Sequence, residues 1–180
     1  MGLYIIIGVV ILLLIIFLII LNNYLKVKDL NSNIDASVLN IQDVLTKKKD
    51  TINSVIEIVK DEKVKALFEK YNENDNIFVK DTLLFDISWN INKLLLDKDN
   101  DKKKKKRKSK KDEKIDDFEK EIASLDESLE GLKDYYNANA IKYNELINKK
   151  PLKLLYKILK LTEKETFEYS KLSEYEILKN

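Results

Sequence analysis

The chain has 180 residues, and its 33 basic and 31 acidic side chains give a formal net charge of +2 at pH 7. Cysteine and histidine are both absent, which excludes disulfides, thiolate or imidazole metal ligands, cysteine nucleophiles and histidine acid–base catalysis. With only three glycines and one proline there is little material for turns, so the composition favours long helices over a β fold.

Residues 3–21 form an apolar stretch that contains no charge and no proline. As a helix it spans roughly 28 Å, close to the ~30 Å hydrocarbon core of a bilayer. A cleaved signal peptide would need a basic start, a shorter apolar segment and a small-residue cleavage site, and the sequence has none of these. We therefore predict that residues 1–22 are a single-pass membrane anchor, with the lipid bilayer as a partner.

The charges beside this stretch predict its orientation. No lysine or arginine precedes it, whereas Lys26 and Lys28 follow it closely. Positive charge is enriched on the cytoplasmic side of membrane helices, which places the N-terminus outside and the C-terminal portion in the cytoplasm. The abundance of lysine, asparagine and isoleucine is typical of an AT-rich bacterial genome, so we expect a bacterial cell membrane.

Residues 23–150 are predicted to form an antiparallel bundle of three to four long helices, so the fold class is all-α. Apolar residues recur at spacings of three and four, the period of a helix with one buried face. The first helix is expected from Tyr24 to about Phe68 and a turn at 71–76. A second helix of about twenty residues is expected from Ile77, and a third over 115–148. The buried face of the first helix is marked by Ile34, Val38, Ile41, Leu45, Ile52, Val55 and Val59.

A charged, low-complexity stretch at 97–114 interrupts the predicted bundle. Such a run cannot bury apolar surface, so it is expected to be a loop. The alternative is a polybasic site for anionic lipid or, less expected, nucleic acid, because basic residues near an anionic membrane attract it. The candidate contacts are Lys102, Lys103, Lys104, Lys105, Lys106, Arg107, Lys108, Lys110 and Lys111.

The last part of the chain, 151–180, is expected to contain one short amphipathic helix and a loose tail. Pro151 suits the first turn of a helix over 152–161. Its apolar face is predicted to consist of Leu152, Leu155, Ile158 and Leu159, with lysines on the other face. The remaining residues, 162–180, are charged.

Two Tyr-Asn pairs, Tyr136-Asn137 and Tyr143-Asn144, stand seven residues apart in the third helix. The tyrosines lie on its apolar face and are predicted to be core residues. Asparagine is a poor helix-interior residue, which indicates that Asn137 and Asn144 have specific partners. We expect them to bond across to Lys47, Lys48 or Asp50 on the first helix; the alternative is a ligand-binding face.

These pairs, followed by Pro151, resemble the closing signature of the LemA family. The block 41–60 and the anchor are similar to that family as well. The resemblance implies an antiparallel bundle of long helices behind one membrane span, and it implies no reaction. The chain departs from the family at Asn53-Ser54, where Pro-Asn is usual, and it lacks the acidic Tyr-Pro-Asp-Leu segment.

The sequence offers no Gly-rich phosphate loop and no paired carboxylates that would serve catalysis. We therefore expect a protein that is not an enzyme and that needs no cofactor or metal. A non-catalytic scaffold or adaptor for other membrane or envelope proteins fits the predicted anchor and bundle.

Overall fold

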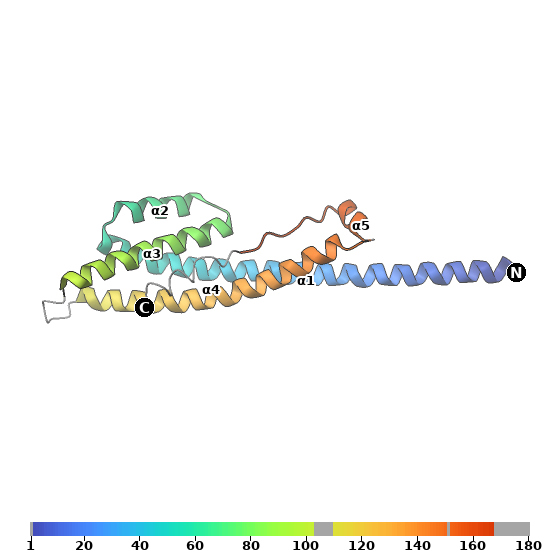
Figure 1. The fold of residues 1–180 in the computed structure, drawn as a ribbon, viewed down its shortest axis with the longest axis horizontal. Coiled ribbons are helices and arrows are strands. Elements are labelled where there is room, and N and C mark those ends of the chain that lie inside the picture. Colours follow the sequence, from blue (N-terminus) through green and yellow to red (C-terminus); the bar gives the residue numbers. More distant parts are fainter. Residues whose placement is uncertain (1, 103–109, 151, 168–180) are drawn as a thin grey trace. The chain divides into compact units, whose positions relative to one another are not determined.

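The computed structural model describes residues 2–102, 110–150 and 152–167 (Figure 1). These residues form helices and connecting segments without a strand, which confirms the all-α prediction. The helices are α1 (Gly2–Val59), α2 (Glu62–Glu73), α3 (Ile77–Lys102), α4 (Lys110–Asn148) and α5 (Lys153–Ile158). The chain divides into two units: the terminal unit comprises residues 1–38 and 134–180, and the middle unit comprises residues 39–133.

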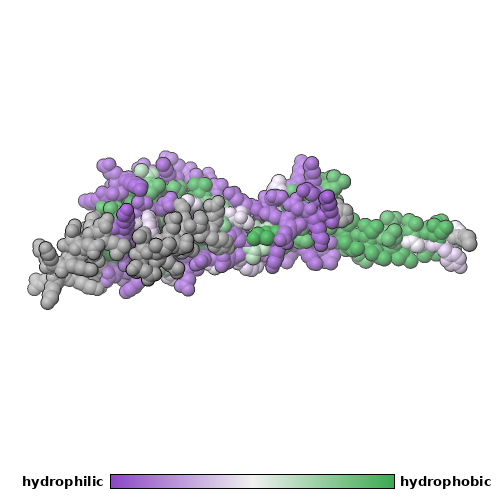
Figure 2. Space-filling model, in the orientation of Figure 1, coloured by the Kyte–Doolittle hydropathy of each residue, from purple (hydrophilic) through white to green (hydrophobic). Residues whose placement is uncertain are grey.

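Helix α1 continues from the apolar stretch into the polar part of the chain without a break. The change in polarity at Asn22-Asn23 does not end it, because neither residue is a glycine or a proline. The side chain of Asn23 donates a hydrogen bond to the carbonyl of Ile19 at 2.7 Å, within the same helix. Residues 2–19 are all exposed (Figure 2, green). One helix is therefore long and apolar enough to cross a membrane and also supplies the first helix of the bundle.

The prediction that the first helix reaches Phe68 is wrong, because α1 ends at Val59. Lys60 adopts a left-handed conformation with a φ of 53°. The carboxylate of Asp61 then accepts a hydrogen bond from the backbone N–H of Val64 at 3.0 Å and caps α2. A capping aspartate therefore divides a segment that has the apolar period of one helix.

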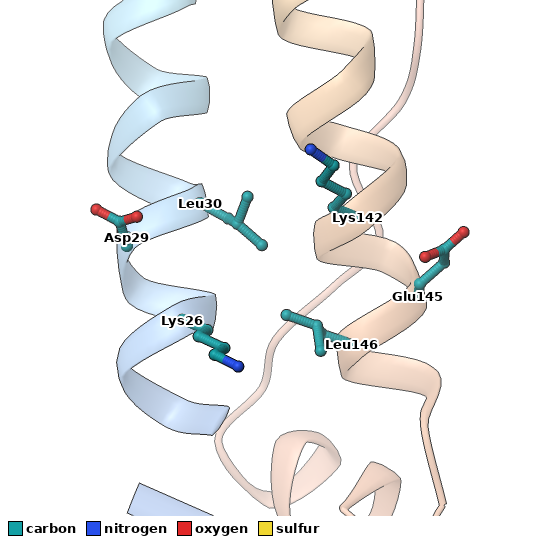
Figure 3. A pocket seen from close by; sticks show the side chains of 6 residues that line it. All are labelled: Lys26, Asp29, Leu30, Lys142, Glu145 and Leu146. Carbon is teal, nitrogen blue, oxygen red and sulfur yellow. The ribbon is translucent and has the colours of Figure 1, made fainter. Parts of the chain in front are cut away.

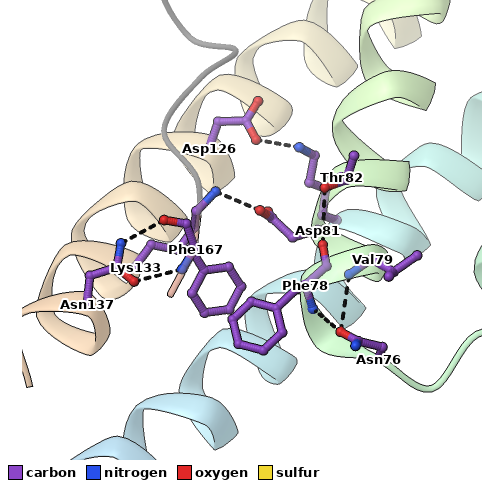
Figure 4. Close-up of polar contacts among 10 residues, drawn as sticks. Asn76, Phe78, Val79, Asp81, Thr82, Asp126, Lys133, Asn137 and Phe167 are labelled. Atoms are coloured by element: carbon purple, nitrogen blue, oxygen red, sulfur yellow. Dashed lines mark hydrogen bonds and ion pairs between the residues drawn. The ribbon is translucent and has the colours of Figure 1, made fainter. Parts of the chain in front are cut away.

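The middle unit is held by apolar residues from all the helices that enter it. Five of the seven residues predicted for the buried face of α1 are buried there, Ile41, Leu45, Ile52, Val55 and Val59, and α2 packs against α3. Of the other two, which belong to the terminal unit, Ile34 is buried and Val38 is half-buried. Asn76 caps the start of α3 by accepting hydrogen bonds from the N–H groups of Phe78 and Val79 (Figure 4). The buried residues include Ile41, Leu45, Ile52, Val55, Val64, Tyr71, Leu84, Ile87, Ile91, Phe118, Ile122 and Leu129.

The charged stretch is more helical than the predicted loop at 97–114. Helix α3 continues to Lys102 and α4 begins at Lys110. The stretch contains no glycine or proline, and lysine is a good helix former, so these helices extend although the residues have no apolar face. Residues 103–109 lie outside the described part of the chain.

The expected short helix is present as α5, but its predicted apolar face is wrong. Leu152 and Tyr156 are buried, whereas Ile158 is 70% exposed and Leu159 44% exposed. The helix has only six residues, and the side chains that hold it, at positions 152 and 156, are one turn apart. Only this narrow face is covered, so the neighbouring apolar side chains stay exposed.

Candidate functional site

The two Tyr-Asn pairs bind the chain's own C-terminal segment. Asn137 donates from Nδ2 to the carbonyl of Phe167 at 2.9 Å, and its Oδ1 accepts from the N–H of Phe167 at 2.8 Å (Figure 4). Asn144 does the same with Lys164, and both of its hydrogen bonds are 2.8 Å long. Each amide therefore binds the donor and the acceptor of one backbone residue. We call these two side chains the asparagine clamp.

The seven-residue spacing of the clamp matches the segment that it binds. Seven residues along a helix cover roughly 10.5 Å. Three residues of extended chain, the separation of Lys164 from Phe167, cover about 10 Å. Figure 1 shows the segment after α5 running back along the end of α4. The two asparagines can therefore bind two residues of one extended segment at the same time.

The tyrosines beside the clamp complete the contact. The hydroxyl of Tyr136 donates to the carbonyl of Glu165 at 3.0 Å, and its ring meets that of Phe167 edge to face, with centroids 5.1 Å apart. The ammonium of Lys164 lies 5.6 Å from the centre of the Tyr143 ring, within cation–π range. The site is thus a face that docks a polypeptide segment. Its asparagine amides bind the backbone of the segment, and its tyrosine rings contact the side chains.

Both tyrosines are buried, as predicted. Burial raises the pKa of the Tyr136 hydroxyl, and the nearby carboxylates of Glu165 and Asp35 raise it further. Burial and Asp35 raise the pKa of Tyr143 in the same way. Both hydroxyls are therefore held in the neutral form, which suits hydrogen bonding and packing but not proton abstraction at neutral pH.

The predicted partners of the asparagines are wrong. Asn137 and Asn144 bond to backbone atoms of residues 167 and 164, not to Lys47, Lys48 or Asp50. An extended backbone presents an N–H and a C=O that match both ends of an amide, whereas a lysine or aspartate side chain can satisfy only one end.

Lys47, Lys48 and Asp50 interact with other residues of the middle unit. The buried ammonium of Lys48 pairs with Asp126 at 2.5 Å, whereas Lys47 forms an exposed pair with Asp43 at 2.7 Å. Burial raises the pKa of Tyr71, and the negative charge of Asp50 raises it further, which places that carboxylate within electrostatic reach of the ring hydroxyl. A further pair, Lys133 with Asp81 at 2.6 Å, joins α4 to α3 (Figure 4).

Sequence reasoning missed the segment that the clamp binds, because residues 162–180 were expected to be loose. Phe167 is buried, and Asn148 donates to the carboxylate of Glu163 at 2.7 Å. The signal in the sequence was the repeat of Tyr-Asn after two helical turns. Such a repeat predicts that the two asparagines bind successive positions of one partner segment. Residues 168–180 lie outside the described part of the chain.

The polybasic alternative falls mostly outside the described residues. Lys102 ends α3, and Lys110 and Lys111 begin α4. The other predicted contacts, in the range 103–109, are among the residues that the structure does not describe. Binding of anionic lipid or nucleic acid by this cluster therefore stays a prediction.

An open hollow of about 360 Å³ lies between α1 and α4 in the terminal unit (Figure 3). Its lining contains two lysines, two carboxylates and two leucines, so its charges balance and it favours neither anions nor cations. Elsewhere in the described residues, acidic side chains do not gather in groups of three as a metal site would require. The hollow is lined by Lys26, Asp29, Leu30, Lys142, Glu145 and Leu146.

The clamp and the segment that it binds lie together in one matched region. Residues 102–177 match the LemA family. The LemA match includes both Tyr-Asn pairs and Phe167, so it confirms the resemblance where the clamp is formed. The similarity of the block 41–60 lies outside the match and stays a prediction. Comparison with curated proteins and with solved structures found no match.

Proposed function

We propose that this protein is a membrane-anchored helical scaffold or adaptor for other envelope proteins. The observation that carries the proposal is the continuity of α1. Its apolar first part is wholly exposed, and the same helix goes on to form the bundle. An exposed apolar helix of this length is stable in lipid, where its backbone hydrogen bonds are satisfied internally. The LemA match is compatible with this arrangement.

A non-catalytic role is supported by the use of the polar groups at the Tyr-Asn face. The amides of Asn137 and Asn144 and the hydroxyl of Tyr136 are bonded to the chain's own backbone. These groups hold the C-terminal segment in place instead of facing a cavity where a substrate would bind. We therefore propose that the protein acts by presenting its surface to partners and requires no cofactor.

The proposed orientation places the bundle in the cytoplasm, with Lys26 and Lys28 on the inner side of the membrane. The chain has no cysteine, so single cysteines can be introduced as reporters. A cysteine at exposed Leu39 should resist a membrane-impermeant thiol reagent in intact cells and react after permeabilisation. Labelling in intact cells would contradict this orientation.

The scaffold proposal is tested by photocrosslinking in native membranes. A crosslinking amino acid is placed at Leu39, Tyr135 or Ile141, all of which are exposed on the bundle. At least one position should give a discrete adduct with another envelope protein, and buried Ile52 is the matched control. A second sample lacks residues 2–21 and, after a high-salt wash, should leave the membrane fraction and lose the adduct. Recovery of uncrosslinked chain alone from all three positions would overturn the proposal.

A further inference from the structure

We infer that α5 is a second membrane contact, an interfacial helix that lays Leu154, Ile158 and Leu159 on an anionic lipid surface. The inference goes beyond the scaffold role but rests on the proposed membrane anchoring. The position of α5 in the terminal unit, its exposed apolar face and the charge around it all support this contact.

The position of α5 in the terminal unit places it near the membrane surface. The hollow in Figure 3 shows that Lys142 and Leu146 of α4 lie beside Lys26 and Leu30 of α1. Lys26 follows the end of the apolar stretch at Leu21 by roughly 7.5 Å of helix. That distance equals the depth of one headgroup layer, which is about 5–8 Å. Helix α4 runs toward the apolar stretch and ends at Asn148, so α5, which begins at Lys153, follows at the level of the headgroups.

One apolar face of α5 is not covered by the rest of the described chain. Leu154 is 69% exposed and Ile158 is 70% exposed, and they stand four residues apart on one side of the helix. On another side Leu152 and Tyr156 are buried and hold α5 in place. The apolar side chains are therefore displayed on a fixed helix, and their transfer into the acyl boundary is favourable.

The charge on and around α5 favours an anionic surface. Between residues 146 and 162 the chain has five lysines and no acidic residue. All five are exposed, and none forms an ion pair with another described residue. A basic helix with one apolar face is the pattern of an interfacial helix that binds anionic lipid. The lysines are Lys149, Lys150, Lys153, Lys157 and Lys160.

One of these lysines provides a clean charge-removal variant. Lys160 has a φ of 56°, and it ends α5 with hydrogen bonds from its own N–H to the carbonyl of Lys157 and from Leu161 N–H to the carbonyl of Tyr156. This is a Schellman motif, whose left-handed position favours glycine. Lys160→Gly therefore removes a charge and keeps the backbone conformation.

The experiment uses the full chain in vesicles of phosphatidylcholine and phosphatidylglycerol. An environment-sensitive fluorophore is attached to a single cysteine at Leu154, with quenchers carried on the lipid chains. Matched sites are Leu13 in the apolar stretch and Ile141, which is 51% exposed on α4. The label at Leu154 should be quenched severalfold more than the label at Ile141.

Charge dependence is the second arm. Quenching at Leu154 should fall in pure phosphatidylcholine vesicles, in high salt and in the Lys153→Gln, Lys157→Gln and Lys160→Gly variants. Each removed charge should weaken the partitioning of α5 roughly fivefold, the equivalent of about 1 kcal/mol. The Leu13 label should not change in any of these samples.

The outcomes separate this inference from the anchoring proposal. Quenching at Leu13 but not at Leu154 overturns the inference and leaves the anchor. Quenching at Leu154 but not at Leu13 supports the interfacial helix and overturns the anchor, and quenching at neither site overturns both. A label at Leu154 that is shielded from water without lipid quenching indicates a protein partner on this face and also overturns the inference.

Discussion

An asparagine side chain can satisfy one residue of an extended backbone completely, because its amide offers one acceptor and one donor at the right separation. Asn137 and Asn144 both use this property, one on Phe167 and the other on Lys164. A shorter serine or a charged aspartate would satisfy only part of the same residue. The clamp therefore explains why Asn137 and Asn144, whose side-chain amides disfavour helix interiors, stand seven residues apart in α4.

We predict that Asn137→Leu and Asn144→Leu each destabilise the fold. Each change leaves a backbone N–H and C=O without their partners, which should cost about 1–3 kcal/mol. The larger loss is expected at Asn137, which is 4% exposed. Urea unfolding of a variant lacking residues 1–22 measures the effect. Glu145→Leu on the exposed side of α4 is the control and should be neutral; unchanged midpoints in both asparagine variants would contradict the clamp.

The two ion pairs of the first helix provide a second comparison at this scale. The side chain of Lys48 is 1% exposed and that of Asp126 28%, whereas Lys47 and Asp43 are 62% and 64% exposed. Asp126→Asn leaves a buried ammonium without its counterion and should cost about 2–4 kcal/mol. Asp43→Asn removes a solvated pair and should cost less than about 0.5 kcal/mol. Equal losses in denaturant unfolding would show that the Lys48 pair is not buried in solution.

At the scale of elements, the apolar period identified α1, α3 and α4 but not the division between α1 and α2. The period carries no information about where a helix turns back, because Val59 and Val64 both belong to buried faces. The break depends on Lys60 and Asp61. Both are polar residues of a kind that also occurs on the exposed face of a continuous helix, so the apolar period does not distinguish them. Similarly, the predicted buried face of α5 consisted of leucines and an isoleucine, whereas Tyr156 is buried in the structure. Nothing in the sequence around Tyr156 indicates that it is buried.

The left-handed Lys60 leads to a prediction about this break. A side chain at positive φ is strained, and glycine is not. We predict that Lys60→Gly stabilises the protein by about 0.5–1 kcal/mol, since the relief of strain exceeds the added freedom of the unfolded chain. The matched control is Lys65→Gly within α2, which should destabilise by about 1 kcal/mol. Thermal melts of both variants test this; a lower midpoint for Lys60→Gly would mean that α1 continues past Val59 in solution.

At the scale of the whole molecule, the all-α fold class and the order of the three long helices α1, α3 and α4 follow from composition and period, whereas α2 does not. Long stretches with the apolar period of a helix, and few glycines and prolines, favour long helices over a β fold. The docking of the C-terminal segment could not be predicted in this way. It depends on backbone atoms, which every residue has, and the sequence between 162 and 167 has no repeated pattern. Only the spacing of Asn137 and Asn144 indicates that a segment docks there, and the same spacing fits a contact between two helices equally well.

The last prediction concerns how much the docked segment contributes to the terminal unit. A chain that ends at Leu161 loses all four hydrogen bonds of the clamp, the bond from Tyr136 and the buried ring of Phe167. Burial of one phenylalanine alone contributes about 1.5–3 kcal/mol. The truncation should therefore lower the melting temperature more than the double change Asn137→Leu with Asn144→Leu.

Adding the missing segment as a separate peptide distinguishes specific docking from a general effect of truncation. A peptide of residues 162–167 with an amidated end should restore part of the lost stability, because the amides of the clamp recognise backbone and do not require a covalent link. The same peptide with proline in place of Lys164 lacks the N–H that donates a hydrogen bond to Asn144 Oδ1, so it should restore less of the stability. In the truncated chain that also carries Asn137→Leu and Asn144→Leu, neither peptide should have an effect. Equal rescue by both peptides would mean that the contacts of Phe167 hold the segment and that neither Asn144 nor the Tyr143 ring contributes to its docking.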